Sequence, residues 1–339
     1  MNNMMNEKAK LNGNIFKKEV EIKAIRDGYG EALVELGENI ADVVALSADL
    51  SESTRVEEFR KRFPERFFET GVAEQNLATI AAGLGVSGKI PFISSYATFS
   101  PGRNWEQIRT TIAYNNANVK IAGHHAGISA GPDGATHQAI EDIATMRVMA
   151  NMTVFVPCDA YEAKKTTLAS ARIYGPVYIR CAREKTPIVT TEETPFTPGK
   201  AEIFWESKKI KTRSKKPDVC VIACGTEVYH ALCAAQELEK EDINVVVLNV
   251  HTIKPLDEKT LVEEARRAGA LVTAEEHQIF GGLGGAIAEL LAKKCPLPME
   301  FVGMKDTFGE SGEYNDLVKK YGLGSKDIIK AVKKVIKRK

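Results

Sequence analysis

The sequence lacks an excess of charge of either sign, and this absence argues against one large class of function. Its 339 residues contain 46 Lys and Arg against 45 Asp and Glu, a formal net charge of +1 at pH 7. Dedicated nucleic-acid-binding proteins usually carry a strong basic excess. The one basic run, residues 333–339, is more typical of a solvated helix end than of a nucleic-acid-binding arm. We therefore expect no nucleic acid among the partners.

Long apolar runs and paired cysteines are missing as well. No apolar stretch approaches the roughly 20 residues that a membrane-spanning helix needs. Residues 1–10 are rich in Asn and Lys and lack the apolar segment of a secretory signal. The six cysteines form no C-x-x-C pair and have no His at zinc-finger spacing, which is typical of buried, reduced thiols. These absences predict a cytoplasmic protein with no membrane partner.

What the sequence does contain is an alternation of short apolar runs with helical patterns. In its first half, strands are predicted over 42–47, 119–122 and 153–156, and helices over 73–86, 103–114, 138–149 and 160–173. In its second half, strands are predicted over 219–223, 245–250, 271–274 and 299–302, and helices over 227–238, 257–268 and 283–292. Such alternation favours parallel sheets covered by helices on both faces.

A change of composition separates the two halves. Thr, Pro, Glu and Lys dominate the stretch between them, which is typical of a linker. We therefore predict an α/β protein with two parallel-sheet domains, a first domain over 18–186, a linker over 187–216 and a smaller second domain over 217–339.

Three of the six histidines, His124, His125 and His137, fall in one glycine-rich segment that begins where a predicted strand ends. In open α/β sheets, ligands bind beyond the carboxyl ends of the strands. Capping of the next helix by Asp133 and Thr136 is the simpler interpretation, but capping requires no histidine. A metal site is disfavoured, because the adjacent histidines would diverge and no Cys or second carboxylate lies at ligand spacing. The segment is therefore predicted to bind a ligand other than a metal.

A second candidate, Glu74, opens a helix that is apolar over almost all of 77–86. A glutamate at a helix start is usually a favourable partner of the helix dipole. A carboxylate that leads into a buried helix is nevertheless costly unless it has a partner or a task. Further polar and aromatic residues at strand ends or on a nearby helix are weak evidence singly and gain weight in combination: Arg26, Asp49, Ser53, Phe99, Arg180 and Arg183.

In combination, the motifs over 47–50, 71–76, 98–99, 133–138 and 183–187 resemble the C-terminal half of transketolase. The resemblance extends from about Val20 to the end of the chain, and the segment 249–257 is shared with thiamine enzymes more widely. It implies a thiamine diphosphate-enzyme pyrimidine-binding domain followed by the smaller transketolase C-terminal domain. It also implies the transfer of a two-carbon ketol group between sugar phosphates.

One part of the family pattern is missing. Transketolases bind the diphosphate through Mg²⁺ in a preceding domain that carries a Gly-Asp-Gly motif, and this sequence contains no such motif. The resemblance therefore implies one subunit of a split transketolase, inactive alone. A separate N-terminal subunit would supply the diphosphate-binding and Mg²⁺-binding half, and two copies of each subunit would form a heterotetramer.

The resemblance also implies roles for residues around the cofactor. Glu74 matches the carboxyl group that hydrogen-bonds the aminopyrimidine ring nitrogen, and Phe99 matches the ring that stacks on the pyrimidine. His137 matches a residue near the cofactor amino group and is predicted to move substrate protons. Asp49 is counted with the cofactor-binding residues, while Trp105 is expected to pack in the core.

A further set matches the family's substrate contacts. Arg26, Ser53 and Arg183 are expected to hold the phosphate, with His125 assisting. Arg180 lies close enough in sequence to Arg183 to compete for that role. Asp133 matches the carboxylate that contacts a sugar hydroxyl, and His124 is expected either to be structural or to support a residue that contacts the ligand.

Three alternatives stay open at the level of sequence. Deoxyxylulose-phosphate synthases share the Glu-Gln and Asp-Gly-x-x-His patterns but normally form a single long chain. Beta subunits of 2-oxoacid dehydrogenases are split in the same way but lack the loop over 133–138. A non-catalytic paralogue is expected to have lost Glu74 or His137, and this chain has both.

Overall fold

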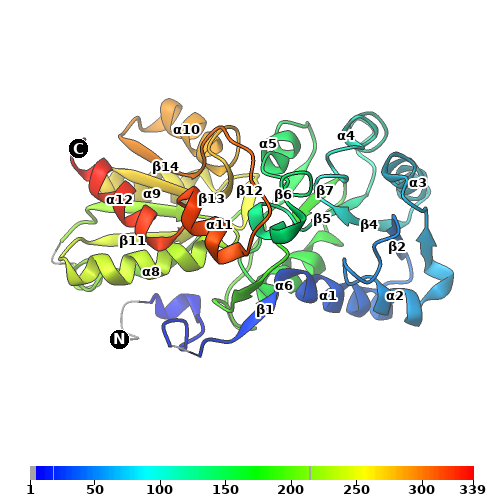
Figure 1. Cartoon of the computed structure of the whole chain (residues 1–339), viewed down its shortest axis with the longest axis horizontal. Coiled ribbons are helices and arrows are strands. Elements are labelled where there is room, and N and C mark those ends of the chain that lie inside the picture. The colour runs from blue at the N-terminus through cyan, green and yellow to red at the C-terminus, as the bar shows by residue number, and fades with distance from the viewer. Residues whose placement is uncertain (1–4, 18, 214) are drawn as a thin grey trace.

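Two sheets organise the computed structural model, which describes residues 5–17, 19–213 and 215–339 (Figure 1). Residue 18, at the start of the predicted first domain, lies outside the described residues, as do residues 1–4 and residue 214 of the predicted linker. None of the described helices is long and apolar enough to cross a membrane. The six cysteines are free thiols, and four of them are buried.

Among the described residues, the larger sheet has seven strands, six of them mutually parallel. Across the sheet they are β12 (Thr252–Lys254), β6 (Thr153–Phe155), β7 (Val177–Arg180), β5 (Lys120–His124), β4 (Ile90–Tyr96), β2 (Val43–Ser47) and β3 (Phe67–Glu69). The antiparallel edge strand β12 comes from the second half of the chain. The two halves therefore share a sheet.

Helices cover both faces of this sheet, as the alternation predicted (Figure 1). They are α1 (Ile25–Asn39), α2 (Glu57–Arg62), η3 (Pro64–Arg66), α3 (Glu74–Val86), α4 (Trp105–Gln107), η4 (Ile108–Ala113), η5 (Ile128–Asp133), α5 (Asp142–Arg147) and α6 (Ala160–Ser170). Successive residues of β2 point to opposite faces. Val43 and Ala45 belong to a core with α1, α2 and α6, whereas Val44 and Leu46 belong to a core with α3, η4 and α5.

The second sheet has five strands among the described residues, and its edge strand β9 is antiparallel. Its strands, in order, are β14 (Met299–Met304), β13 (Leu271–Gln278), β10 (Val219–Ala223), β11 (Val245–Asn249) and β9 (Glu202–Glu206). Its helices are α7 (Lys208–Lys211), α8 (Glu227–Lys240), α9 (Glu258–Ala268), α10 (Leu283–Lys294), α11 (Tyr314–Tyr321) and α12 (Ser325–Ile336). A short helix, η2 (Glu7–Ala9), precedes both sheets.

The structure corrects three predicted elements. The predicted linker over 187–216 contains β9 and α7, and β9 pairs with β11. The helix predicted over 138–149 covers only Asp142–Arg147, because the loop before it continues to residue 141. The helix predicted over 103–114 is a short α4 followed by the π-helix η4.

A third, two-stranded sheet pairs β1 (Ile22–Ala24) with β8 (Lys185–Pro187). Its strands are more than 150 residues apart in the sequence. This pairing brings the start of α1 next to the segment that follows β7, and both carry residues of the candidate site.

Candidate active site

The glycine-rich loop after β5 forms the centre of the candidate site. Residues 125–141 connect the carboxyl end of β5 to α5. His125 has a left-handed backbone conformation with φ of 52°. At Gly127, φ is 76°, and a Cβ there would lie 2.5 Å from Glu276 Oε1. Only glycine fits at this position. The loop therefore packs closely against β13, on which Glu276 lies.

Two arginines from distant parts of the chain lie beside this loop. Arg26 Nη1 donates a hydrogen bond to Ser53 O at 3.1 Å. Arg183 Nη1 donates to Ala130 O at 2.7 Å. Burial, and then the positive charges of Arg55 and Arg183, lower the pKa of Arg26. A bound anion would relieve this repulsion between cations.

His125 is a neutral partner of Arg26. Burial is the main cause that lowers the pKa of His125 to about 2, and the charges of His124 and Arg26 add to it. His125 Nε2 faces Arg26 Nη1. Because a guanidinium only donates, we assign the ring proton to Nδ1. Within the part of the chain that the structure describes, Nδ1 is buried without a hydrogen-bond partner. A bound ligand can accept from this donor.

Tyr96, at the end of β4, joins the aromatic residues of the site. Its ring stacks on His125 with centroids 4.0 Å apart. It lies 6.2 Å from the Phe99 ring and 6.3 Å from His137. Phe99 and His137 meet edge to face at 5.4 Å. Sequence reasoning missed Tyr96, although its place at the end of an apolar run just before Phe99 was an available signal.

Glu74 is the first residue of α3, and its side chain is only 2% exposed. Its Oε2 has no hydrogen-bond partner among the described residues. Arg103 Nη1 lies 3.6 Å from this oxygen, and the Arg103 guanidinium lies 5.6 Å from the centre of the Phe99 ring. Arg103 is a second residue that sequence reasoning missed. It connects Glu74 to the aromatic group.

The two aspartates predicted for the site are exposed. Asp49 follows β2 with φ of 58°, and its backbone N–H donates to Glu69 Oε1 at 2.8 Å. Asp133 is the last residue of η5. Both lie beyond the carboxyl ends of parallel strands, where ligands of such sheets bind.

Arg180 requires a correction. Its side chain is 3% exposed, and its Nε donates to Asp142 Oδ2 at 2.9 Å. Its Nη2 donates to Glu276 O at 2.8 Å, and Tyr178 donates its hydroxyl proton to Asp142 at 2.6 Å. The guanidinium thus lies between the two sheets and is held by hydrogen bonds to Asp142 and to the backbone of Glu276. Arg180 does not compete with Arg183 for a phosphate.

Trp105 is partly buried, whereas His124 lies in the interior. Trp105 packs against the core and donates from Nε1 to Thr145 O at 3.1 Å, as expected for a packing residue. His124 is fully buried.

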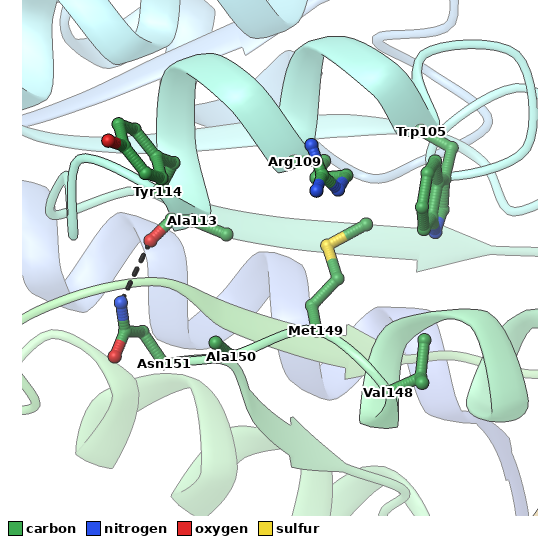
Figure 2. Close-up of a pocket in the computed structure, with 8 residues that line it drawn as sticks. All are labelled: Trp105, Arg109, Ala113, Tyr114, Val148, Met149, Ala150 and Asn151. Atoms are coloured by element: carbon green, nitrogen blue, oxygen red, sulfur yellow. Dashed lines mark hydrogen bonds between the residues drawn. The ribbon is translucent and has the colours of Figure 1, made fainter.

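Trp105 also lines a groove of about 560 Å³ between η4 and the segment after α5 (Figure 2). This groove contains none of the predicted site residues. Among the described residues, no group of three His, Cys, Asp or Glu is placed to hold a metal ion.

Comparisons with known proteins agree with this architecture. Residues 22–188 match the family model of the transketolase pyrimidine binding domain, and residues 208–328 match that of the transketolase C-terminal domain. The putative transketolase C-terminal section of Methanocaldococcus jannaschii is 43% identical over 319 residues, which are 93% of this chain and 97% of the relative. The 6-deoxy-6-sulfo-D-fructose transketolase subunit SqwH of Clostridium sp. (strain MSTE9) is 39% identical over 324 residues, 96% of this chain and 98% of the relative.

A solved structure shows the same likeness. A split gene transketolase, described as an inactive beta4 tetramer, aligns with a TM-score of 0.84 at 47% identity. The alignment covers 93% of this chain and 98% of that one.

Fold and matches together define a pyrimidine-binding domain joined to a C-terminal domain. The chain belongs to the transketolase family and corresponds to the C-terminal section of a split transketolase. The predicted family and the predicted α/β class are confirmed, with sheets that are mostly rather than wholly parallel.

Proposed function

We propose that this chain is the C-terminal subunit of a split transketolase that transfers a two-carbon ketol group between sugar phosphates with thiamine diphosphate. The buried carboxyl group of Glu74 carries the proposal. Its Oε2 has no hydrogen-bond partner among the described residues, and Arg103 links it to the Phe99 ring. A buried polar atom without a partner is costly. A flat ring that stacks on Phe99 and presents a polar nitrogen to Glu74 fits this arrangement.

Glu74, Phe99, His137 and Asp49 would hold the cofactor, which supplies an electron sink for the carbon fragment that is transferred. Glu74 would hold a proton at the pyrimidine ring nitrogen, and Phe99 would stack on the ring. His137 lies edge-on to Phe99 and would exchange protons with the substrate. Asp49, exposed after β2, would add a polar contact at the same sheet edge.

The phosphate end of the substrate would bind between Arg26 and Arg183. Each guanidinium makes a backbone contact and keeps further N–H groups for a phosphate, which a planar guanidinium matches well. His125 would donate from Nδ1, and Ser53, whose backbone carbonyl already contacts Arg26, would offer its hydroxyl. Asp133 would accept from a sugar hydroxyl, a contact that rejects a sugar lacking that donor.

An N-terminal subunit would supply the diphosphate site and Mg²⁺. The clostridial relative is named as a subunit. Exposed apolar side chains on and beside α3 also support a partner at this end of the molecule. They are Val72, Ile80 and Val86, with exposed fractions of 69%, 37% and 66%.

We further propose two copies of each subunit, arranged around a two-fold axis as a heterotetramer. The related split gene transketolase, which is inactive as a beta4 tetramer, supports the need for a second kind of subunit. The cytoplasm is the proposed location, since reduced thiols are typical of that compartment.

The proposal is tested by ketol transfer from xylulose 5-phosphate to ribose 5-phosphate with thiamine diphosphate and Mg²⁺. The chain is assayed alone and mixed with the candidate N-terminal subunit. We expect turnover only in the mixture. A second donor, 6-deoxy-6-sulfo-D-fructose, is included because the clostridial relative is named for it.

Three outcomes would contradict the proposal. Turnover by the chain alone would remove the need for a partner. Condensation of pyruvate with glyceraldehyde 3-phosphate by the mixture, without ketol transfer, would assign the protein to the deoxyxylulose-phosphate synthases. Decarboxylation of a 2-oxoacid without ketol transfer would assign it to the dehydrogenase beta subunits.

A further inference from the structure

The turn after Phe99 has a rigid backbone. A Cβ on Gly102 would lie 1.9 Å from Thr98 O, so the turn tolerates only glycine there. Asn104 is buried, and its Nδ2 donates to Glu74 O at 2.9 Å and to Ser100 Oγ at 3.1 Å. These contacts tie the turn to the start of α3. The backbone on either side of residue 103 is therefore fixed relative to Glu74.

The side chain of Arg103, by contrast, is 54% exposed. Its guanidinium lies over the Phe99 ring at 5.6 Å, and Nη1 lies 3.6 Å from Glu74 Oε2. This separation is longer than a hydrogen bond. Arg103 thus stands between the two groups proposed to hold the pyrimidine, although neither of them binds it tightly.

A guanidinium and an aminopyrimidine have similar recognition chemistry. Both are planar, both stack on an aromatic face, and both present polar nitrogens in their plane to a carboxyl group. Phe99 and Glu74 therefore offer one face and one edge that only one of the two can occupy.

We propose that Arg103 is a built-in competitor of the cofactor pyrimidine. It occupies the place between Phe99 and Glu74 before thiamine diphosphate binds and leaves this place when the cofactor binds. This inference rests on the proposed function of the same site. Before the cofactor binds, the arginine balances the charge of a carboxyl group that would otherwise be buried without a counter-charge. When it binds, rotation of the exposed side chain clears the site, and the turn need not move.

The test compares the affinity of the assembled complex for thiamine diphosphate in the presence of Mg²⁺. Calorimetry on the complex of this chain with the N-terminal subunit gives Kd for the wild type, Arg103→Ala and Arg103→Lys. Loss of one cation–π contact and one partly exposed ion pair should lower Kd by about threefold to thirtyfold in Arg103→Ala. Arg103→Lys keeps the charge but loses the planar group, and its Kd should lie between the other two.

The chain offers a matched control at Arg60. This arginine is 52% exposed, lies 3.6 Å from Glu57 Oε2 and stands 5.5 Å from the Phe67 ring, but on α2, outside the candidate site. Arg60→Ala should bind the cofactor like the wild type. A general effect of removing an exposed, stacked arginine would appear in both variants.

The outcomes separate the two proposals. Unchanged or weaker binding by Arg103→Ala, with normal binding by the wild type, overturns the inference and leaves the proposed function standing. Failure of the wild type and of all three variants to bind thiamine diphosphate overturns the proposed function, and the inference with it. A lower Kd for Arg103→Ala, with the Kd of Arg60→Ala equal to that of the wild type, supports both proposals.

Discussion

Two adjacent histidines, His124 at the end of β5 and His125 directly after it, keep the positive charge of the candidate site on its arginines. His124 meets the Tyr29 ring edge-on at 4.9 Å, and both of its nitrogens are buried without a partner among the described residues. Burial, and then the charge of Arg26, lower the pKa of His124 to about 3. His125, beside Arg26, is neutral for the same reasons. A phosphate would therefore meet the permanent charges of Arg26 and Arg183, which do not vary with pH in the physiological range.

The pKa of His124 leads to a prediction about acid stability. An unfolded histidine titrates near pH 6.5, so between about pH 3 and about pH 6.5 the unfolded state holds a proton that the folded state does not. The free energy of unfolding therefore falls as the pH is lowered through this window, by about 1.4 kcal/mol per pH unit. His124→Asn should reduce the slope of unfolding free energy against pH by about this amount between about pH 4 and about pH 6, measured by urea unfolding.

Buried carboxyl groups act in the opposite direction in both proteins. Burial raises the pKa of Glu162 and of Glu276 to about 7. Because these carboxyl groups ionise more readily in the unfolded state, their contribution to the free energy of unfolding falls as the pH rises above their unfolded pKa. They contribute equally to the wild type and to His124→Asn, and the difference between the two slopes isolates the histidine. Equal slopes would mean that His124 takes up its proton within the folded chain.

At the scale of single residues, motifs in the sequence predict which residues belong to the candidate site better than they predict which side chains contact one another in the fold. Glu74 could be singled out because a carboxylate that leads into a buried helix is costly unless it has a partner or a task. Arg180 and Arg183 could not be distinguished, because the partner that removes Arg180 from the site, Asp142, lies on another element. Tyr96 lies beside His125 only after β4 and β5 have paired.

At the scale of elements, helix packing depends on single glycines. α1 lies against α6 so closely that a Cβ on Gly28 would fall 1.8 Å from Ala160 O. This oxygen belongs to the backbone of α6, so it cannot move aside without a shift of the helix. On α3, by contrast, a Cβ on Gly83 would meet no atom within 4 Å.

These two glycines predict opposite effects of the same substitution. Gly28→Ala should lower the free energy of unfolding by about 3 kcal/mol or more, because α1 and α6 must separate. Gly83→Ala should raise it by up to about 1 kcal/mol, because alanine has the higher helix propensity and nothing obstructs its methyl group. Urea unfolding of the two variants of the isolated chain measures both effects. A loss of similar size in both variants would contradict the packing argument.

Elements with strong periodicity were predictable, and those defined by distant partners were not. β10 has the predicted bounds, 219–223, because its run of apolar residues is buried on both sides. β9 was hidden in a stretch rich in Thr, Pro and Lys. Its Phe204 and Trp205 are buried by partners distant in the sequence, among them β11, with which β9 pairs as an edge strand. Register between distant segments is a tertiary property that local composition does not record.

At the scale of the whole molecule, the two halves interlock rather than meet at a linker. β12 of the second half extends the first sheet, and Asn249 Nδ2 donates to Glu162 Oε1 at 2.6 Å across the halves. Arg180 adds a further link, from Asp142 to the backbone of Glu276. The candidate loop over 125–141 lies along this junction, where Gly127 packs against Glu276. The C-terminal domain therefore packs against the candidate loop through β13.

The proposed function depends most directly on Glu74. The decisive measurement is ketol transfer by the complex of this chain with the N-terminal subunit, with Glu74→Gln compared with the wild type. Glu57→Gln, on α2 and outside the set of predicted site residues, serves as the control. Glutamine keeps the shape of the side chain but cannot hold the proton. We predict that Glu74→Gln still binds thiamine diphosphate and loses at least about 100-fold in kcat, while the control keeps full activity. A kcat for Glu74→Gln equal to that of the wild type would contradict the central claim that this buried carboxyl group drives the reaction.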